Sequence, residues 1–265
     1  NKKIDQGYNG SVSSRYSYPY GPGGSAQVTV KSGKLGVSSY MGLSNQSAPS
    51  TEFSGSRFTI PSQTRLMQNG SRKNEAGWGH ANLELSYEID SLNLITAEGG
   101  FNKYGGSNSS DQLSLQTSQN GDVEQRYRLN NAGDFNWGGY ELGLNYQLGF
   151  KRNKEQLLTG SYKFNSNNDD MLNELIASEK INYNLNDYRQ ENNSGTKEQT
   201  VQLDYLHPIN KKLNIEGGLK GILRGNFSDY EYQNFNPTTG EFLTDEVRSN
   251  KFNYQQDVYS FYNSY

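Results

Sequence analysis

Hydrophobic and polar residues alternate one by one through several stretches of the chain. In residues 140–150, aromatic or aliphatic side chains at even positions are separated by polar residues or glycine. Residues 80–89 and 213–223 repeat the pattern. Weaker versions occupy residues 12–20, 26–30, 35–43, 158–164 and 201–205. Because successive side chains of a strand point to opposite faces of a sheet, each stretch predicts a strand with one apolar and one polar face.

Two kinds of connection separate these stretches. Short polar segments at residues 31–34, 90–91, 151–154 and 209–212 predict tight turns. Segments rich in Asn, Ser, Gly and Asp predict long loops, at residues 47–74, 103–133, 166–196 and 226–250. The sequence therefore predicts an all-β fold, an antiparallel up-and-down meander of about ten long strands with tight turns at one end and long loops at the other.

One segment permits two interpretations. Residues 169–177 place apolar side chains at helical spacing behind a possible Asp cap. The same residues can instead form the rising arm of a loop hairpin that continues to residue 186. Both interpretations stay open at this stage.

The apolar faces of these strands can meet either a dry protein interior or lipid. Four features favour lipid: long strands, a hydrophilic second face, connections of unequal length, and aromatic residues near strand ends. These aromatic residues are Tyr16, Tyr18, Tyr20, Tyr87, Tyr140, Phe150 and Tyr205. A closed barrel also pairs the backbone groups that hydrocarbon would otherwise leave unsatisfied. We therefore predict that the sheet is part of a transmembrane β-barrel.

Composition agrees with this prediction. Only 32% of the 265 residues are hydrophobic, yet the chain has 20 Tyr and 11 Phe and a net charge of only −3, which argues against disorder. A barrel needs few aliphatic residues because lipid supplies part of its apolar surroundings. Basic residues are scattered without a stripe, which excludes nucleic acid as a partner.

Several other classes are excluded by what the sequence lacks. It has no cysteine, which rules out a disulfide scaffold, a thiolate zinc site and a catalytic thiol. No apolar run approaches the ~20 residues of a membrane-spanning helix. No apolar stretch follows residues 1–5, so we expect no signal peptide, and a chain that is either mature or cut from something longer.

Three parts of the sequence resemble TonB-dependent outer-membrane receptors of the Bacteroidetes type. The first is GYNGSV at residues 7–12 with KSGKLGV at 31–37. The second is QTVQLDYLHPI at residues 199–209 with KKLNIEGGLK at 211–220, and the third is YQQDVYSFY at 254–262. The resemblance implies a receptor whose barrel of about 22 strands encloses an N-terminal plug. It also implies import of large or scarce solutes with energy relayed from the inner membrane.

The sequence departs from that family in having no recognisable plug, no motif for the energising partner and too few strands. We therefore expect residues 1–265 to be one incomplete β-barrel region without a separate second domain. The resemblance places it in the outer membrane of a Gram-negative bacterium. The implied partners are outer-membrane lipid, the plug and remaining barrel strands of the full-length protein, and a TonB-type complex acting through the missing part.

Residues that could carry chemistry have simpler explanations. His207 precedes Pro208 beside a short turn, where proline ends a strand. His80 lies near the loop end of its strand and could form an acid–base pair with a loop Asp, but no partner stands at a recognisable spacing. Acidic pairs at residues 169–170, 229–231 and 245–246 match no calcium loop, and no glycine run matches a phosphate loop. We therefore predict no catalytic residue, no metal, no cofactor and no enzymatic activity.

Ligand contact is expected from polar strand faces and loop aromatic residues. The aromatic residues either form a binding rim or pack on one another; they are Tyr104, Tyr127, Tyr183, Tyr188, Tyr230, Tyr232, Phe235 and Phe242. The predicted ligand- or lumen-facing residues are Glu84, Glu88, Glu141, Gln147, Glu216, Lys220, Tyr230 and Tyr232. The predicted function is the barrel wall of a TonB-dependent receptor for nutrient uptake. The alternatives are a self-contained ten-stranded outer-membrane pore or enzyme, and a soluble all-β surface adhesin.

Overall fold

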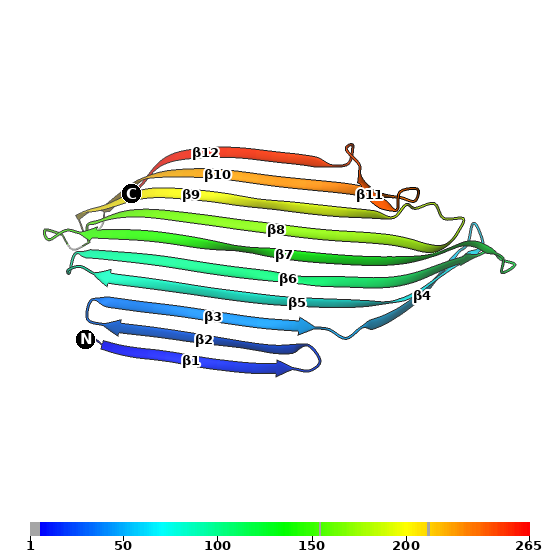
Figure 1. The fold of residues 1–265 in the computed structure, drawn as a ribbon. Coiled ribbons are helices and arrows are strands. Elements are labelled where there is room, and N and C mark those ends of the chain that lie inside the picture. Colours follow the sequence, from blue (N-terminus) through cyan, green and yellow to red (C-terminus); the bar gives the residue numbers. More distant parts are fainter. Residues whose placement is uncertain (1–5, 154, 211–212) are drawn as a thin grey trace.

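The computed structural model describes residues 6–153, 155–210 and 213–265, which form one antiparallel sheet of twelve strands (Figure 1). The strands are β1 (Gln6–Ser17), β2 (Gly21–Ser32), β3 (Leu35–Ser47), β4 (Thr51–Thr59), β5 (Thr64–Glu88), β6 (Asn93–Thr117), β7 (Val123–Gly149), β8 (Leu157–Ile181), β9 (Tyr188–Asn210), β10 (Leu213–Asn236), β11 (Glu241–Thr244) and β12 (Asn250–Ser264). Ten of them follow one another across the sheet, while β4 adds to β5 and β11 to β10. The predicted antiparallel meander is confirmed.

Strands β5 to β10 are far longer than a membrane crossing requires. Each has 23 to 27 residues, which at ~3.3 Å per residue is about 75–90 Å. A bilayer core is only about 30 Å thick. Roughly half of each strand therefore continues beyond the membrane.

These continuations correct the prediction of long loops. Most residues of the four polar segments lie in strands, and the turns themselves are short, at residues 118–122 and 182–187. Asn, Ser and Gly have low strand propensity, but pairing with the adjacent strands overrides that preference. Residues 169–177 likewise lie in β8, so the helix interpretation is wrong and the hairpin interpretation is confirmed.

The two predicted tight turns that the structure describes in full lie at the end of the sheet that carries the N mark in Figure 1, whereas the short turn between β1 and β2 lies at the other end of those strands. The turn between β2 and β3 and the turn between β5 and β6 are where the sequence predicted them. Residue 154 of the third predicted turn and residues 211–212 of the fourth lie outside the described residues. Residues 1–5, which were considered for a signal peptide, also lie outside them.

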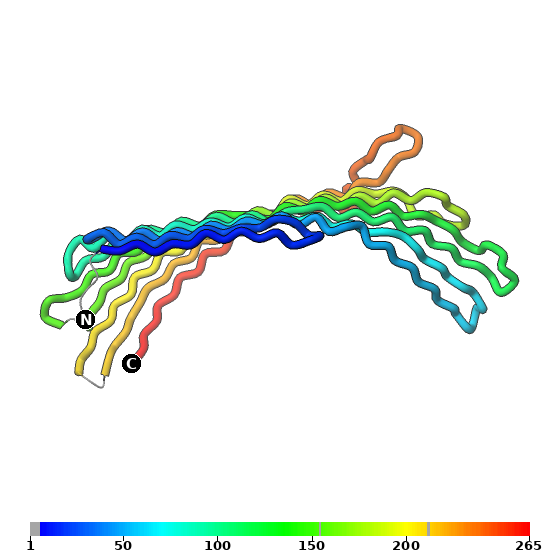
Figure 2. Tube along the Cα trace, turned by 90° about the horizontal axis from the view of Figure 1, so that it is seen from below, coloured from blue at the N-terminus to red at the C-terminus, as the bar shows by residue number. Residues whose placement is uncertain are grey.

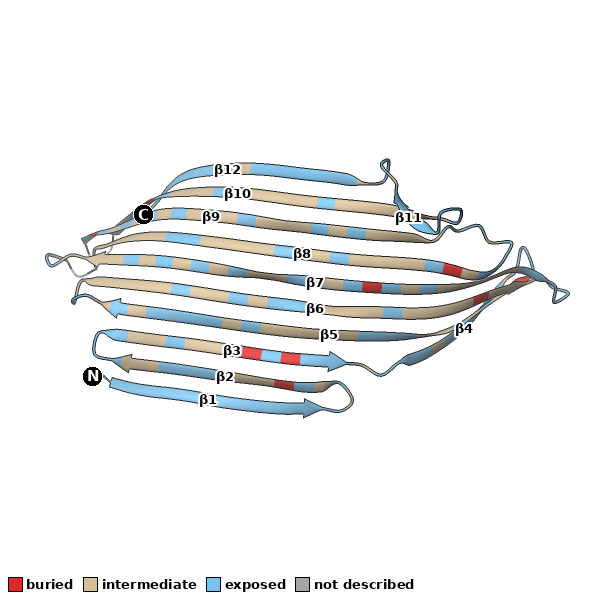
Figure 3. Ribbon diagram, viewed as in Figure 1, coloured by how far each residue is buried: buried red, intermediate tan, exposed pale blue. Residues whose placement is uncertain are grey.

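The sheet is a single curved layer (Figure 2). In the described part of the chain, neither a helix nor a second sheet covers either face. Ala177 and Pro208 are the buried residues with an apolar side chain among those described, and most others are exposed or intermediate (Figure 3). Leu83, Leu144 and Leu219 are 43%, 53% and 56% exposed, so they share no dry interior. No described helix has the length and hydropathy to span a membrane.

Strand register assigns these side chains to one face. Directly paired residues of adjacent strands point to the same side of a sheet. Leu83 and Leu144 belong to one set of paired positions, and Leu219 joins it through Leu203 and Tyr146. We call this side the outer face. The opposite side, which carries Glu84 and its paired positions, is the inner face.

Glycine positions indicate which face is concave. A Cβ atom added at the inner-face residues Gly106, Gly139 or Gly143 would lie within 2.4 Å of neighbouring atoms. At the outer-face residues Gly79 and Gly225 it would meet nothing within 4 Å, and Gly195 on β9 is an exception, where it would lie 2.5 Å from the Asn167 carbonyl oxygen. Because side chains converge on the concave side of a curved sheet, the inner face is the concave one, as the interior of a barrel requires.

The outer face carries an apolar band edged by aromatic residues. It runs along β7 from Tyr140 and ends at Phe150, directly after the strand, and the Tyr140 ring lies 5.7 Å from that of Phe164 on β8. Ten residue steps of ~3.3 Å, tilted by ~40°, span about 25 Å, the height of the apolar band of outer-membrane barrels. The parts of β5 to β10 beyond this band, away from the tight turns, are called the external extension.

Candidate functional site

Charged side chains lie on the inner face at the edge of the apolar band. Lys163 Nζ lies 2.9 Å from Glu141 Oε2, and Arg224 Nη2 lies 2.6 Å from Glu198 Oε2. These ion pairs come from the adjacent strands β7 to β10 and are all partly exposed. We call these four residues the charge ladder. A surface of this kind is stable only against water or another polar surface, because removing a charged group from water without giving it a partner is costly.

The structure places six predicted lumen residues together on the inner face. By register, Glu84 lies opposite Ser38 and Glu98, and Lys220 lies opposite Gln202 and Ser260. The same alternation holds for the other four, which are Glu88, Glu141, Gln147 and Glu216. Glu141 is part of the charge ladder, and Glu88 Oε1 lies 2.6 Å from Lys31 Nζ. Contact of these residues with a plug or a ligand stays a prediction.

Tyr230 and Tyr232 also lie on the inner face, but in the external extension of β10. The Tyr232 ring is 5.4 Å from the Tyr188 ring, and the Arg248 guanidinium lies 4.7 Å from the Tyr232 ring centre. Burial raises the pKa of Tyr188. Tyr232 therefore packs within the protein, as in the alternative that loop aromatic residues pack on one another.

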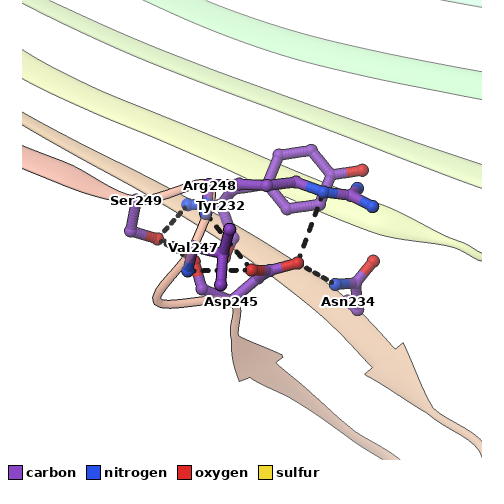
Figure 4. Close-up of polar contacts among 6 residues, drawn as sticks. All are labelled: Tyr232, Asn234, Asp245, Val247, Arg248 and Ser249. Atoms are coloured by element: carbon purple, nitrogen blue, oxygen red, sulfur yellow. Dashed lines mark hydrogen bonds and ion pairs between the residues drawn. The ribbon is translucent and has the colours of Figure 1, made fainter.

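The connection between β11 and β12 is held by one carboxylate (Figure 4). Asp245 Oδ1 accepts the backbone N–H groups of Val247 and Arg248 at 3.1 and 3.2 Å. Its Oδ2 accepts the Asn234 amide at 3.1 Å and lies 3.4 Å from Arg248 Nε. With every partner supplied by nearby residues, this acidic position is explained by local structure.

A second ion cluster braces the tips of β7 and β8. Glu179 accepts hydrogen bonds from Arg126 and from Arg128, the latter at 2.7 Å. The hydrogen bond from Arg128 is the main cause that lowers the pKa of Glu179. Nearby, the rings of Tyr127 and Tyr183 stack 3.8 Å apart.

His80 has no acidic partner among the residues paired with it. Its register partners on the adjacent strands are Gly42 and Asn102, and its ring centre lies 6.0 Å from that of Tyr40. Among the residues described, no group of three or more His, Cys, Asp or Glu side chains is arranged to hold a metal ion.

Sequence reasoning missed one feature of the inner face. Trp78, Tyr104 and Trp137 stand side by side on β5, β6 and β7, because Tyr104 pairs with both tryptophans. Phe135 adds a fourth ring, 5.3 Å from Tyr104. These four residues are called the aromatic patch. The signal was present in the alternation: counted from Glu84, Trp78 falls on the polar face, as Trp137 does counted from Glu141.

Comparison with protein families gives an independent assignment. Residues 148–265, a little under half of the chain, match the model of the outer membrane protein beta-barrel family. The matched part contains β8 to β12. The protein is located in the outer membrane of a Gram-negative bacterium.

Other comparisons add little. A search of curated proteins found no match. Among solved structures, the outer membrane protease OmpT from Escherichia coli is similar at 8% sequence identity and a TM-score of 0.30, over 97% of this chain and 92% of that one. A superposition this poor has no bearing on activity.

Proposed function

We propose that this chain forms part of the barrel wall of a TonB-dependent receptor that takes up a nutrient through the outer membrane. The observation that supports it most is the concave inner face, which is polar and carries the charge ladder at the edge of the apolar band. A wall of this kind suits a wide, hydrated or plug-filled lumen. The external extension would form the entrance through which a ligand arrives.

The sheet edges also support a larger barrel. Within the described residues, β1 pairs only with β2, and β12 pairs only with β10. Unpaired backbone groups cost several kcal/mol each in hydrocarbon. Further strands that pair with both edges would satisfy them, and the receptor resemblance of residues 254–262 favours that solution.

A self-contained ten-stranded pore is the second candidate. Strands β1 and β12 are the first and last of ten alternating strands, so they run antiparallel and could pair with each other. Cysteine pairs test this, because the chain has no cysteine of its own. The pore predicts a disulfide between β1 and β12, scanned as Ser11→Cys with cysteines along residues 252–262. The receptor predicts none, while the control pair Ser13→Cys with Ser25→Cys, whose hydroxyls lie 2.8 Å apart, should cross-link.

A photo-cross-linker tests for the plug. Placed at Lys220 in the full-length protein, it should react with a plug segment of the same polypeptide. At the adjacent Leu219, on the outer face, it should react with lipid. Lipid or solvent capture at both positions would refute the receptor proposal.

We also propose that the chain has no catalytic activity, since His80 pairs with Gly42 and Asn102 rather than with an acid. The protein should leave a panel of peptides and lipids uncleaved. Cleavage that disappears in a His80→Ala variant would contradict this and favour the enzyme alternative.

A further inference from the structure

The aromatic patch is in an unusual place for tryptophan. In outer-membrane barrels, aromatic rings gather at the membrane interfaces and face lipid. Here Trp78 and Trp137 lie on the inner face, where lipid cannot reach them. They are the only two tryptophans of the chain. Their position therefore calls for an explanation other than membrane anchoring.

The patch lies at the outer mouth of the proposed lumen. Trp137 is three residues beyond Tyr140, the aromatic edge of the apolar band, which at a tilt of ~40° places it about 8 Å outside that edge. Tyr104 and Trp137 are each 43% exposed. Large apolar rings that remain exposed in a cluster mark a surface that binds something.

A hollow of about 770 Å³ adjoins the patch and supplies polar groups. Tyr104 and Phe135 line it, together with Tyr20 and Phe53. Its polar lining includes the amide side chains of Asn74, Asn108 and Gln112. Flat rings beside a few fixed hydrogen-bonding groups are the usual composition of a small-molecule site.

Two charged residues line the hollow. Arg72 and Glu75 line it, one of each sign. The Arg72 guanidinium lies 5.1 Å from the Phe53 ring centre, and the Glu75 carboxylate lies 2.5 Å from Lys73 Nζ. The Glu75 carboxylate is thus paired with Lys73 and the Arg72 guanidinium lies against a ring, so most hydrogen-bonding groups of the hollow are uncharged amides and hydroxyls.

From this geometry we infer that the aromatic patch and its hollow bind an uncharged ring-containing solute, with a flat apolar face for the rings and a hydrogen-bonding edge for the amides. A sugar ring and a nucleoside both have this chemistry. The inference rests on the proposed function only for the side from which the solute arrives. Binding itself requires no energising complex.

Intrinsic fluorescence tests the inference, because both tryptophans of residues 1–265 are in the patch, and a Trp78→Phe, Trp137→Phe double variant identifies their share of the emission. The purified full-length protein in detergent is titrated with maltotriose in one arm and adenosine in the other. We expect a saturable change in tryptophan emission with at least one probe, and the arm that responds identifies the source of the ring. No saturable change with either probe would overturn the inference.

Matched variants separate the patch from general effects on folding. Tyr104→Ala should weaken binding about 5- to 150-fold, the range for loss of one stacked ring. Tyr140→Ala, an aromatic residue on the outer face, should leave binding unchanged. Both variants must keep the far-ultraviolet circular dichroism of the parent. Equal loss of binding in both, with folding intact, would contradict a site at the patch.

Failure of the inference and failure of the proposed function give different results. A protein that binds a probe, but whose solute uptake in cells is indifferent to loss of the TonB-type complex, would retain the site and lose the receptor proposal. A protein with TonB-dependent uptake and no response to either probe would retain the receptor proposal and lose the site.

Discussion

The inverted arrangement of the sheet, apolar outward and polar inward, is tested by placing one charge on each face of the same strand. Leu144 lies on the outer face of β7, opposite Ala97 and Tyr162, and is 53% exposed. It stands four residues from Tyr140 and six from Phe150, near the middle of the apolar band. Leu144→Arg therefore puts a guanidinium close to the bilayer midplane.

The expected cost follows from that depth. Arginine at the midplane of a barrel's lipid face destabilises by about 2–4 kcal/mol. At 1.4 kcal/mol per tenfold change, the unfolding equilibrium should shift about 30- to 700-fold. The control is Gln147→Arg, three residues along the same strand on the inner face, opposite Leu94 and Thr159. A side chain that faces water should change stability by no more than about 0.5 kcal/mol.

The assay is equilibrium unfolding by guanidinium of the protein folded into phospholipid vesicles, followed by tryptophan fluorescence. The Leu144→Arg curve should move to lower denaturant, while that of Gln147→Arg should overlie the parent. If both substitutions cost the same, or the inner one costs more, the faces have been assigned the wrong way round.

Three smaller changes probe other parts of the sheet. The hydrogen bond from the backbone N–H of Leu92 is the main cause that lowers the pKa of Asp90. The stabilisation that ionised Asp90 contributes is therefore present above its ordinary pKa of 3.8 and is lost as pH falls through the lower pKa of the folded state. In Asp90→Ala, the midpoint of unfolding should depend less on pH in the acid range. Asp245→Ala should speed amide hydrogen exchange in residues 245–249, because each lost hydrogen bond lowers the local stability by about 1 kcal/mol. Unchanged exchange there would argue that the Asp245 carboxylate does not hold the connection between β11 and β12. Gly139→Ala should lower the yield of folded protein, because the added Cβ would lie 2.3 Å from the Ser166 carbonyl oxygen. The control Gly79→Ala, whose Cβ would meet nothing within 4 Å, should leave the yield unchanged. Equal yields would contradict a concave inner face.

Pairing across the sheet decided how far the strands extend. Residues 103–117 of β6 are rich in Ser, Asn and Gly and have low intrinsic strand propensity, so they were predicted as loop. In the structure every one of them pairs with β5. Residues 169–177 of β8 show the same effect, because pairing with both β7 and β9 outweighs a local spacing that suits a helix.

The sequence by itself determined the local properties of this protein: the positions of the membrane-spanning strands, the two faces of each, and the tight turns at one end. Successive side chains of a strand point to opposite faces whatever its neighbours are, so the sequence of residues 140–150 alone shows which side chains share a face. Only the tertiary structure decided which side is concave, that Lys163 meets Glu141, and that Trp78 and Trp137 flank Tyr104 on the inner face. Those relations join residues 22 to 59 positions apart, and they exist only once the register between strands is set.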